Sequence, residues 1–132
     1  MRIITGKDIE AVCNWPMIVA AMREGHKLDP AILRDSLLEN GKRKMLVRTA
    51  WIPGLASGTK AVTIYPDNPS LTPPKPSVQG QVLLFDEASG DVEAVLEGVD
   101  LTGWKTAGDS ALGADCLART DIRTMVMVGA GS

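Results

Sequence analysis

The sequence predicts an α+β domain in which N-terminal helices pack on a mostly antiparallel sheet. Two observations lead to this fold class. Apolar residues recur at helical spacing up to Gly25, and after Gly41 they give way to short runs rich in β-branched residues, bounded by Gly and Pro. The length of 132 residues is that of one ordinary domain.

Helices are predicted in the first third of the chain. Thr5 followed by Asp8 resembles a capping box and predicts a first helix directly after it. Pro16 suits the first turn of a second helix, which Gly25 would end. A third short helix is predicted over residues 30–40, where Pro opens an apolar pattern that a turn signal closes.

Strands are predicted in the middle of the chain. Residues 45–47 and 60–65 are short β-rich runs, and the proline-rich segment 66–76 is predicted to be a loop. Residues 81–85 and 92–96 predict a hairpin, because the connection between them ends in Gly.

The last part of the chain predicts one more helix and a final strand. The helix is expected from Leu101 to about Leu117, with Thr102 as its N-cap. Residues 125–128 are typical of a short buried strand, and they lead into Gly129-x-Gly131. In dinucleotide-binding folds such glycines let the backbone approach a pyrophosphate. A chance pair of glycines is the alternative.

Composition excludes several classes of protein. A net charge of −2 argues against a dedicated nucleic-acid binder, and no apolar run is long enough to span a membrane. The N-terminus lacks the apolar region of a secretory signal. Cys13 and Cys116 lie far apart, which favours free thiols in the cytoplasm. With His26 as the single histidine, we expect no metal site.

Basic residues are concentrated in one region. Five lie between Gly41 and Lys60 with no acidic residue among them, which indicates a site for a small anion. Lys60 would share a strand face with Val62 and Ile64, as in a pocket. The segment 102–106, at a helix start, could hold a phosphate or carboxylate. The alternatives are solvated edge-strand lysines and an ordinary helix cap.

Taken in order, several segments resemble the ornithine cyclodeaminase/mu-crystallin family. The resemblance covers nearly the whole chain and rests on Gly58-Thr59-Lys60-Ala61-Val62-Thr63, Tyr65-Pro66-Asp67-Asn68, Leu83 to Gly98, Leu101-Thr102-x-x-Lys105-Thr106-Ala107-x-x-Ser110-Ala111-Leu112, and Gly129-Ala130-Gly131. It implies a substrate-binding and dimerisation domain over residues 1–121. Residues 122–132 would then begin a Rossmann domain that binds NAD or NADP, and the acidic residue that distinguishes the two cofactors would lie beyond Ser132.

The resemblance also implies roles for individual residues. Arg43 and Lys60 match residues that bind the substrate carboxylate, and we expect them to converge within about 8 Å, with Lys60 also catalytic. The cofactor would contact Ser77, Lys105, Thr106, Gly129 and Gly131. Lys105 stands where most members have Arg, which removes a bidentate donor. Ala50 stands where cyclodeaminases have an acid, which favours an imine reductase or amino-acid dehydrogenase.

The function expected from the resemblance is hydride transfer between NAD(P) and a small α-amino or α-imino acid in a cytoplasmic homodimer. The chain alone is expected to bind neither cofactor appreciably, because most cofactor contacts would lie beyond Ser132. A non-catalytic ligand-binding or dimerisation module is the alternative function.

Overall fold

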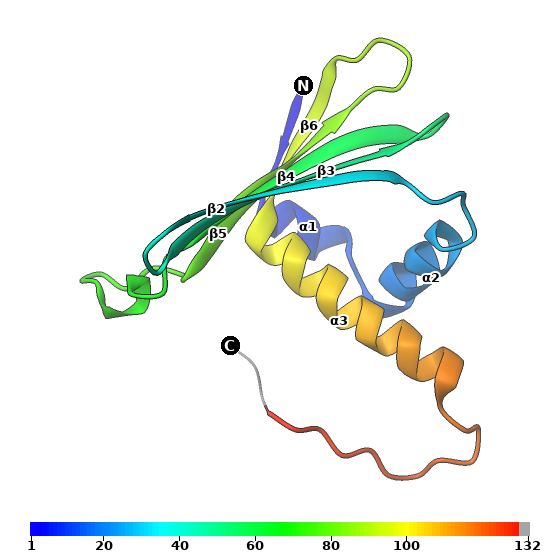
Figure 1. The fold of residues 1–132 in the computed structure, drawn as a ribbon. Helices are drawn as coiled ribbons and strands as arrows, with labels where there is room; N and C mark the ends of the chain where they lie inside the picture. Colours follow the sequence, from blue (N-terminus) through cyan, green and yellow to red (C-terminus); the bar gives the residue numbers. More distant parts are fainter. Residues whose placement is uncertain (130–132) are drawn as a thin grey trace.

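One sheet and three α-helices make up the part of the chain that the structure, a computed structural model, describes, residues 1–129 (Figure 1). The strand order is β1-β6-β5-β4-β3-β2. The strands are β1 (Arg2–Ile4), β2 (Ile32–Asn40), β3 (Arg43–Ile52), β4 (Ala56–Ile64), β5 (Val78–Phe85) and β6 (Val92–Glu97). All neighbours pair antiparallel except β1 and β6, which are parallel. The predicted α+β class is confirmed.

The helices lie on one face of this sheet (Figure 1). They are α1 (Gly6–Val12), α2 (Trp15–Gly25) and α3 (Gly98–Leu117). The long α3 packs on β5 and β6, and both shorter helices pack against α3. We call this face of the sheet the covered face and the opposite one the open face.

The first two helices begin as predicted. Thr5 and Asp8 form a reciprocal capping box, in which the Thr5 amide donates to the Asp8 carboxylate at 2.9 Å. Pro16 lies in the first turn of α2, and Gly25 ends that helix. The Asn14 side chain caps α2 by accepting a hydrogen bond from the Met17 amide at 3.0 Å.

The helix predicted over residues 30–40 is wrong, because this segment is strand β2. Its whole length pairs with β3, from Ile32 opposite Trp51 to Asn40 opposite Arg43. A tight turn with Gly41 at φ +58° joins the two strands, so local helical spacing is overridden by pairing along the whole hairpin. Strand β1, which has three residues, was not predicted either.

The predicted hairpin, loop and middle strands are confirmed. In the turn between β5 and β6, Asp86 accepts hydrogen bonds from the amides of Ala88 and Ser89 at 3.0 and 2.8 Å. The proline-rich loop holds a short 3₁₀ turn, Asn68–Ser70. The Asn68 amide nitrogen donates to the Pro76 carbonyl at 2.9 Å, which closes the loop on itself.

Helix α3 starts earlier than predicted, and Thr102 is not its N-cap. Glu97 occupies the N-cap position, and Thr102 lies in the second turn, where its hydroxyl donates to the Gly98 carbonyl. The start is set by backbone contact, because a Cβ at Gly98 would lie 2.6 Å from the Gly80 carbonyl oxygen. Two glycines therefore let α3 leave directly from the sheet.

The strand predicted over residues 125–128 does not form. Within residues 1–129 this segment pairs with no strand, and its four side chains are between 71% and 96% exposed. A parallel strand needs a neighbour for its hydrogen bonds, and none lies alongside it here. Gly129 has a φ of +87°, and Gly131 lies outside the described residues.

Candidate functional site

A cavity of about 820 Å³ lies between α3 and the covered face of the sheet. Strands β4 and β5 contribute Lys60, Val62 and Gly80 to its wall. Helix α3 and the end of the proline-rich loop supply hydroxyl groups from Ser77, Thr102, Thr106 and Ser110. We call this the Lys60 cavity, because Lys60 is the one cation among the lining residues of the described part of the chain.

Lys60 reaches the cavity from the middle of β4. It shares the covered face with Val62 and Ile64, as the spacing predicts. Its ammonium donates to the Thr102 hydroxyl at 2.9 Å, and among residues 1–129 it forms no ion pair. Partial burial, followed by the charges of Lys105 and Arg48, lowers the pKa of Lys60. This charge is therefore available to an anion that enters the cavity.

The predicted convergence of Arg43 and Lys60 is wrong. Lys60 lies opposite Arg48 in the β3–β4 register, whereas Arg43 is five positions before Arg48 and faces the open side. Five strand residues span about 17 Å. The Arg43 guanidinium instead lies 5.1 Å from the centre of the Tyr65 ring.

Arg48 is the basic residue that the register places beside Lys60. It belongs to the acid-free basic region but was not identified as a site residue from the sequence. Its guanidinium donates to both oxygens of Asp35, at 2.8 and 2.5 Å. These bonds raise the pKa of Arg48 and lower that of Asp35. The place of Arg48 beside Lys60 follows from the register of β3 against β4, for which no sequence motif gives a signal.

The residues predicted to contact the cofactor are only partly brought together. Ser77 and Thr106 line the Lys60 cavity. Lys105 is not among the residues that line it, and its ammonium pairs with Asp109 one turn further along α3. Gly129 is exposed in the segment after α3 and is likewise not among the lining residues. The structure thus groups two hydroxyls with Lys60 and leaves the other two residues outside.

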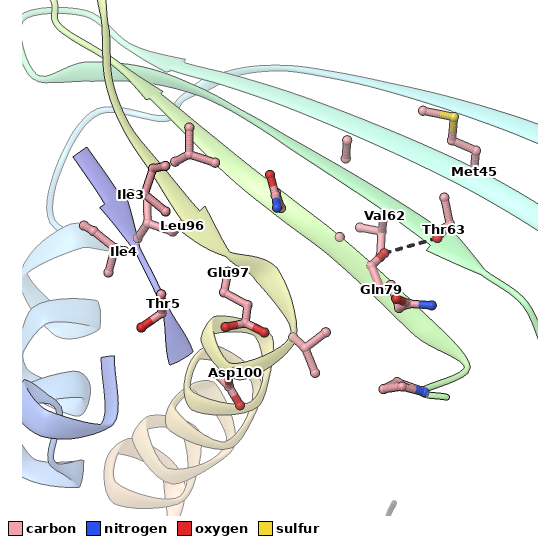
Figure 2. A pocket seen from close by; sticks show the side chains of 16 residues that line it. Ile3, Ile4, Thr5, Met45, Val62, Thr63, Gln79, Leu96, Glu97 and Asp100 are labelled. Carbon is pink, nitrogen blue, oxygen red and sulfur yellow. Dashed lines mark hydrogen bonds between the residues drawn. The ribbon is translucent and has the colours of Figure 1, made fainter. Parts of the chain in front are cut away.

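A second cavity, of about 640 Å³, opens where β1 and the start of α3 meet the open face. Figure 2 shows the side chains of Glu97 and Asp100 beside β1, with Thr63 and Met45 at the other end of this cavity. Glu97 accepts a hydrogen bond from the Gly6 amide at 2.7 Å. The carboxylates of Glu97 and Asp100 would repel an anionic ligand from this second cavity. The Lys60 cavity is therefore the better site for an anion.

Metal ligands and membrane-spanning helices were also sought in residues 1–129. In that range the structure brings together no group of three or more His, Cys, Asp or Glu side chains suited to a metal ion. None of the helices there has the length and apolar character needed to cross a bilayer.

Fold and cavity together define an α+β domain with a cation and several hydroxyls facing a partly apolar pocket, a type of site suited to a small carboxylate. Residues 21–132 match the ornithine cyclodeaminase/mu-crystallin family. The chain belongs to this family, as its motifs predicted.

Individual relatives agree with this assignment. The chain is 41% identical over 125 residues to a Delta(1)-pyrroline-2-carboxylate reductase of Paracoccus denitrificans, a match that covers 95% of this chain and 39% of the relative. The chain thus spans about two-fifths of the length of that relative.

Solved structures show the same fold. An archaeal alanine dehydrogenase dimer with bound NAD superposes with a TM-score of 0.81 at 24% identity, over 92% of this chain and 38% of the other. The Thermococcus litoralis Delta(1)-pyrroline-2-carboxylate reductase, in complex with NADH and L-proline, gives 0.78 at 22% identity, over 92% and 39%.

Proposed function

We propose that this chain provides the substrate-binding part of an NAD(P)-dependent oxidoreductase that acts on a small α-amino or α-imino acid. The observation that carries the proposal is the Lys60 ammonium, which faces a cavity with apolar and hydroxyl walls and has no carboxylate partner among residues 1–129. The substrate named for the Paracoccus denitrificans relative, a cyclic imino acid, has the anionic group and apolar ring that such a cavity suits.

In this proposal Lys60 binds the substrate carboxylate and Val62 contacts the carbon skeleton. A point charge held on a strand fixes the carboxylate, and with it the α-carbon, relative to the rest of the site. Arg48 adds positive potential beside Lys60, although Asp35 occupies its guanidinium. The role of the chain is therefore orientation of the reacting carbon.

The nicotinamide cofactor would supply or accept the hydride. Ser77 and Thr106 fit this group in part, since both are hydroxyl-bearing residues of the cavity that holds Lys60. Lys105 would reach a phosphate only after leaving Asp109, with which it forms a solvent-accessible ion pair. Residues 1–121 would form the substrate-binding domain, and residues 122–132 would lead into the cofactor-binding domain.

We further propose that the open face mediates a homodimer. Several large apolar side chains of this face are exposed, from 42% for Met45 to 74% for Ile3, and they span the sheet from β1 to β2: Ile3, Ile32, Leu38, Met45 and Trp51. Exposed apolar side chains gathered on one face are typical of an association surface. The archaeal alanine dehydrogenase, which shares the fold, is a dimer.

A non-catalytic ligand-binding module is the second candidate function. The lining residues of the Lys60 cavity all lie between positions 60 and 110, so an anion could bind without any further domain.

Ligand titration tests carboxylate binding directly. L-Proline should shift the NMR signals of Lys60 and Thr102 in this chain, and the shift of the Thr102 signal should vanish in Lys60→Met. If both forms respond equally, Lys60 does not bind the carboxylate. NADH should give no saturable binding at micromolar concentration, because only Ser77 and Thr106 of the predicted cofactor contacts lie together. Micromolar NADH binding by calorimetry would contradict the proposed division of the site.

A further inference from the structure

Thr102 makes two hydrogen bonds that connect α3 to the sheet. Its hydroxyl oxygen accepts a hydrogen bond from the Lys60 ammonium at 2.9 Å, and its hydroxyl proton goes to the carbonyl oxygen of Gly98. Both bonds are partly buried at the wall of the Lys60 cavity. The carboxylate-binding proposal does not use this residue.

The Gly98 carbonyl fixes the direction of the Thr102 hydroxyl. A hydroxyl has one proton to donate, and here the proton is committed within the helix. Only lone pairs therefore face Lys60, so Thr102 accepts from the ammonium and cannot compete with it as a donor. Lys60 has three N–H groups, and one of them is used here. Two remain for a ligand in the cavity.

Lys60 differs from its two cationic neighbours in the charge of its partner. Arg48 is bound to the Asp35 carboxylate and Lys105 to the Asp109 carboxylate. Thr102 is neutral, so its hydrogen bond holds the Lys60 ammonium in place without cancelling the positive charge.

The position of Thr102 is itself set by the contact of α3 with the sheet. Gly98 lies one helical turn earlier and packs so closely on Gly80 that a Cβ would meet the backbone. Residue 102 follows Gly98 by four positions and therefore points from the same side of the helix. The pair of glycines thus determines the distance between Thr102 and β4.

We propose that Thr102 is a positioning residue, which holds the Lys60 ammonium toward the cavity with two N–H groups free for a carboxylate. It acts through Lys60 and does not contact the substrate. The proposal rests on the proposed function for the identity of the ligand, but the Thr102–Lys60 contact is testable without any ligand.

The test is a titration of Lys60 in the ligand-free chain, followed through lysine Cε and Nζ signals in isotope-labelled protein. Lys60→Met assigns the signal. A hydrogen bond from an ammonium favours its charged form, so Thr102→Val should lower the pKa of Lys60 further, by about one unit. Thr102→Ser, which keeps the hydroxyl, should restore the value of the parent chain.

Ser110→Ala is the matched control. Ser110 lines the same cavity and donates to the Thr106 carbonyl within α3, as Thr102 does to Gly98, but it does not contact Lys60. It should leave the Lys60 titration unchanged. Should Thr102→Val not fold, Thr102→Ala gives the same readout with a strong helix former.

Two outcomes separate this proposal from the proposed function. If Lys60 titrates in Thr102→Val and in Thr102→Ala as in the parent chain, Thr102 does not position Lys60, whatever the ligand. In a parallel titration with L-proline, the parent should bind more tightly than Thr102→Val, with Thr102→Ser restoring affinity. If the parent itself does not bind while the pKa shift is present, the carboxylate proposal fails and the Thr102–Lys60 contact remains.

Discussion

The two faces of the sheet differ in how far they are covered, although the same strands build both. On the covered face, α3 lies over Lys60 and Val62 and encloses a cavity of about 820 Å³. On the open face, Met45 is 42% exposed, and Ile3 is 74% exposed. Strand β4 contributes to each face in turn, since Ala61 and Thr63 alternate with the residues of the cavity. Residue parity along one strand therefore separates the proposed ligand site from the proposed association surface.

Because the two faces are separate, the largest effect on activity is expected from a substitution on the covered face. In a chimera that carries residues 1–121 of this chain in place of the matching part of the Paracoccus denitrificans reductase, Lys60→Ala should lower kcat/KM for Delta(1)-pyrroline-2-carboxylate. The expected loss is about 2–4 kcal/mol in barrier terms, the scale of a charged contact. Steady-state kinetics with NADH and NADPH measure it.

The control for Lys60→Ala lies three positions away on the other face. Thr63→Ala removes a hydroxyl on the open face, whose hydrogen bond to the Gln79 carbonyl is long, at 3.5 Å. It should change kcat/KM less than twofold. Equal losses from both substitutions would mean that the two faces are not functionally distinct.

The second effect concerns association through the open face. Met45→Glu places a charge on the open face, and interface cores are depleted of charge. If this face forms the dimer, the substitution should weaken dimerisation by about 2 kcal/mol or more, the scale of an interface hot spot. Sedimentation velocity over a concentration series measures the change.

Lys7→Glu provides a charge control on α1, away from the open face. The sedimentation profile of this variant should be the same as that of the parent chain. A parent chain that is monomeric at tens of micromolar would contradict a stable dimer through this face.

The distance along the sequence between interacting residues explains which parts of the fold could be predicted. The first two helix starts and the proline-rich loop depend on residues close in sequence, and Thr5, Pro16 and the loop over residues 66–76 behave as expected. Strand β2 depends on pairing with β3, and its apolar spacing is compatible with a helix. The start of α3 depends on Gly80, eighteen positions before Gly98, and no local pattern indicates that contact.

The same reason accounts for the site. Lys60 and its apolar neighbours follow from alternation along one strand, so their shared face was predictable. The position of Arg43 depends on the register of β3 against β4, which the sequence pattern alone does not provide. With residues 30–40 expected to be helical, Asp35 was not available as a partner for Arg48, and the second cation beside Lys60 was missed.

The third effect tests how α3 is held on the covered face. Gly98→Ala should lower the free energy of unfolding by about 1–3 kcal/mol, because the new Cβ would overlap the Gly80 backbone and force it to move. Urea denaturation followed by circular dichroism measures the change.

Gly103→Ala is the matched substitution in the same helix. A Cβ at Gly103 meets no atom within 4 Å, so Ala should stabilise the chain by about 0.5–1 kcal/mol through its helix propensity. If both substitutions change stability in the same direction, close packing at Gly98 does not determine where α3 begins.

The smallest effect lies where the covered face extends beyond α3 into solvent, at the Asp35–Arg48 pair. Hydrogen bonds from Arg48 lower the pKa of Asp35 in the folded chain below its unfolded value of about 3.9. The folded state therefore binds fewer protons than the unfolded state in the window between the two values. The stabilisation is fully present above about pH 4 and is lost as the pH falls through the lower folded pKa.

Removing the carboxylate should remove this pH dependence. The free energy of unfolding of Asp35→Asn should fall less steeply with acidification below about pH 4 than that of the parent. In an Arg48→Gln background the same substitution should have a smaller effect on the profile, because the partner that lowers the pKa of Asp35 is gone. Parallel profiles for parent and Asp35→Asn would show that the pair contributes nothing to stability. Charged groups at the exposed end of the covered face would then contribute as little to stability as those on the open face. Burial under α3 would be the feature that distinguishes Lys60 from these exposed charges.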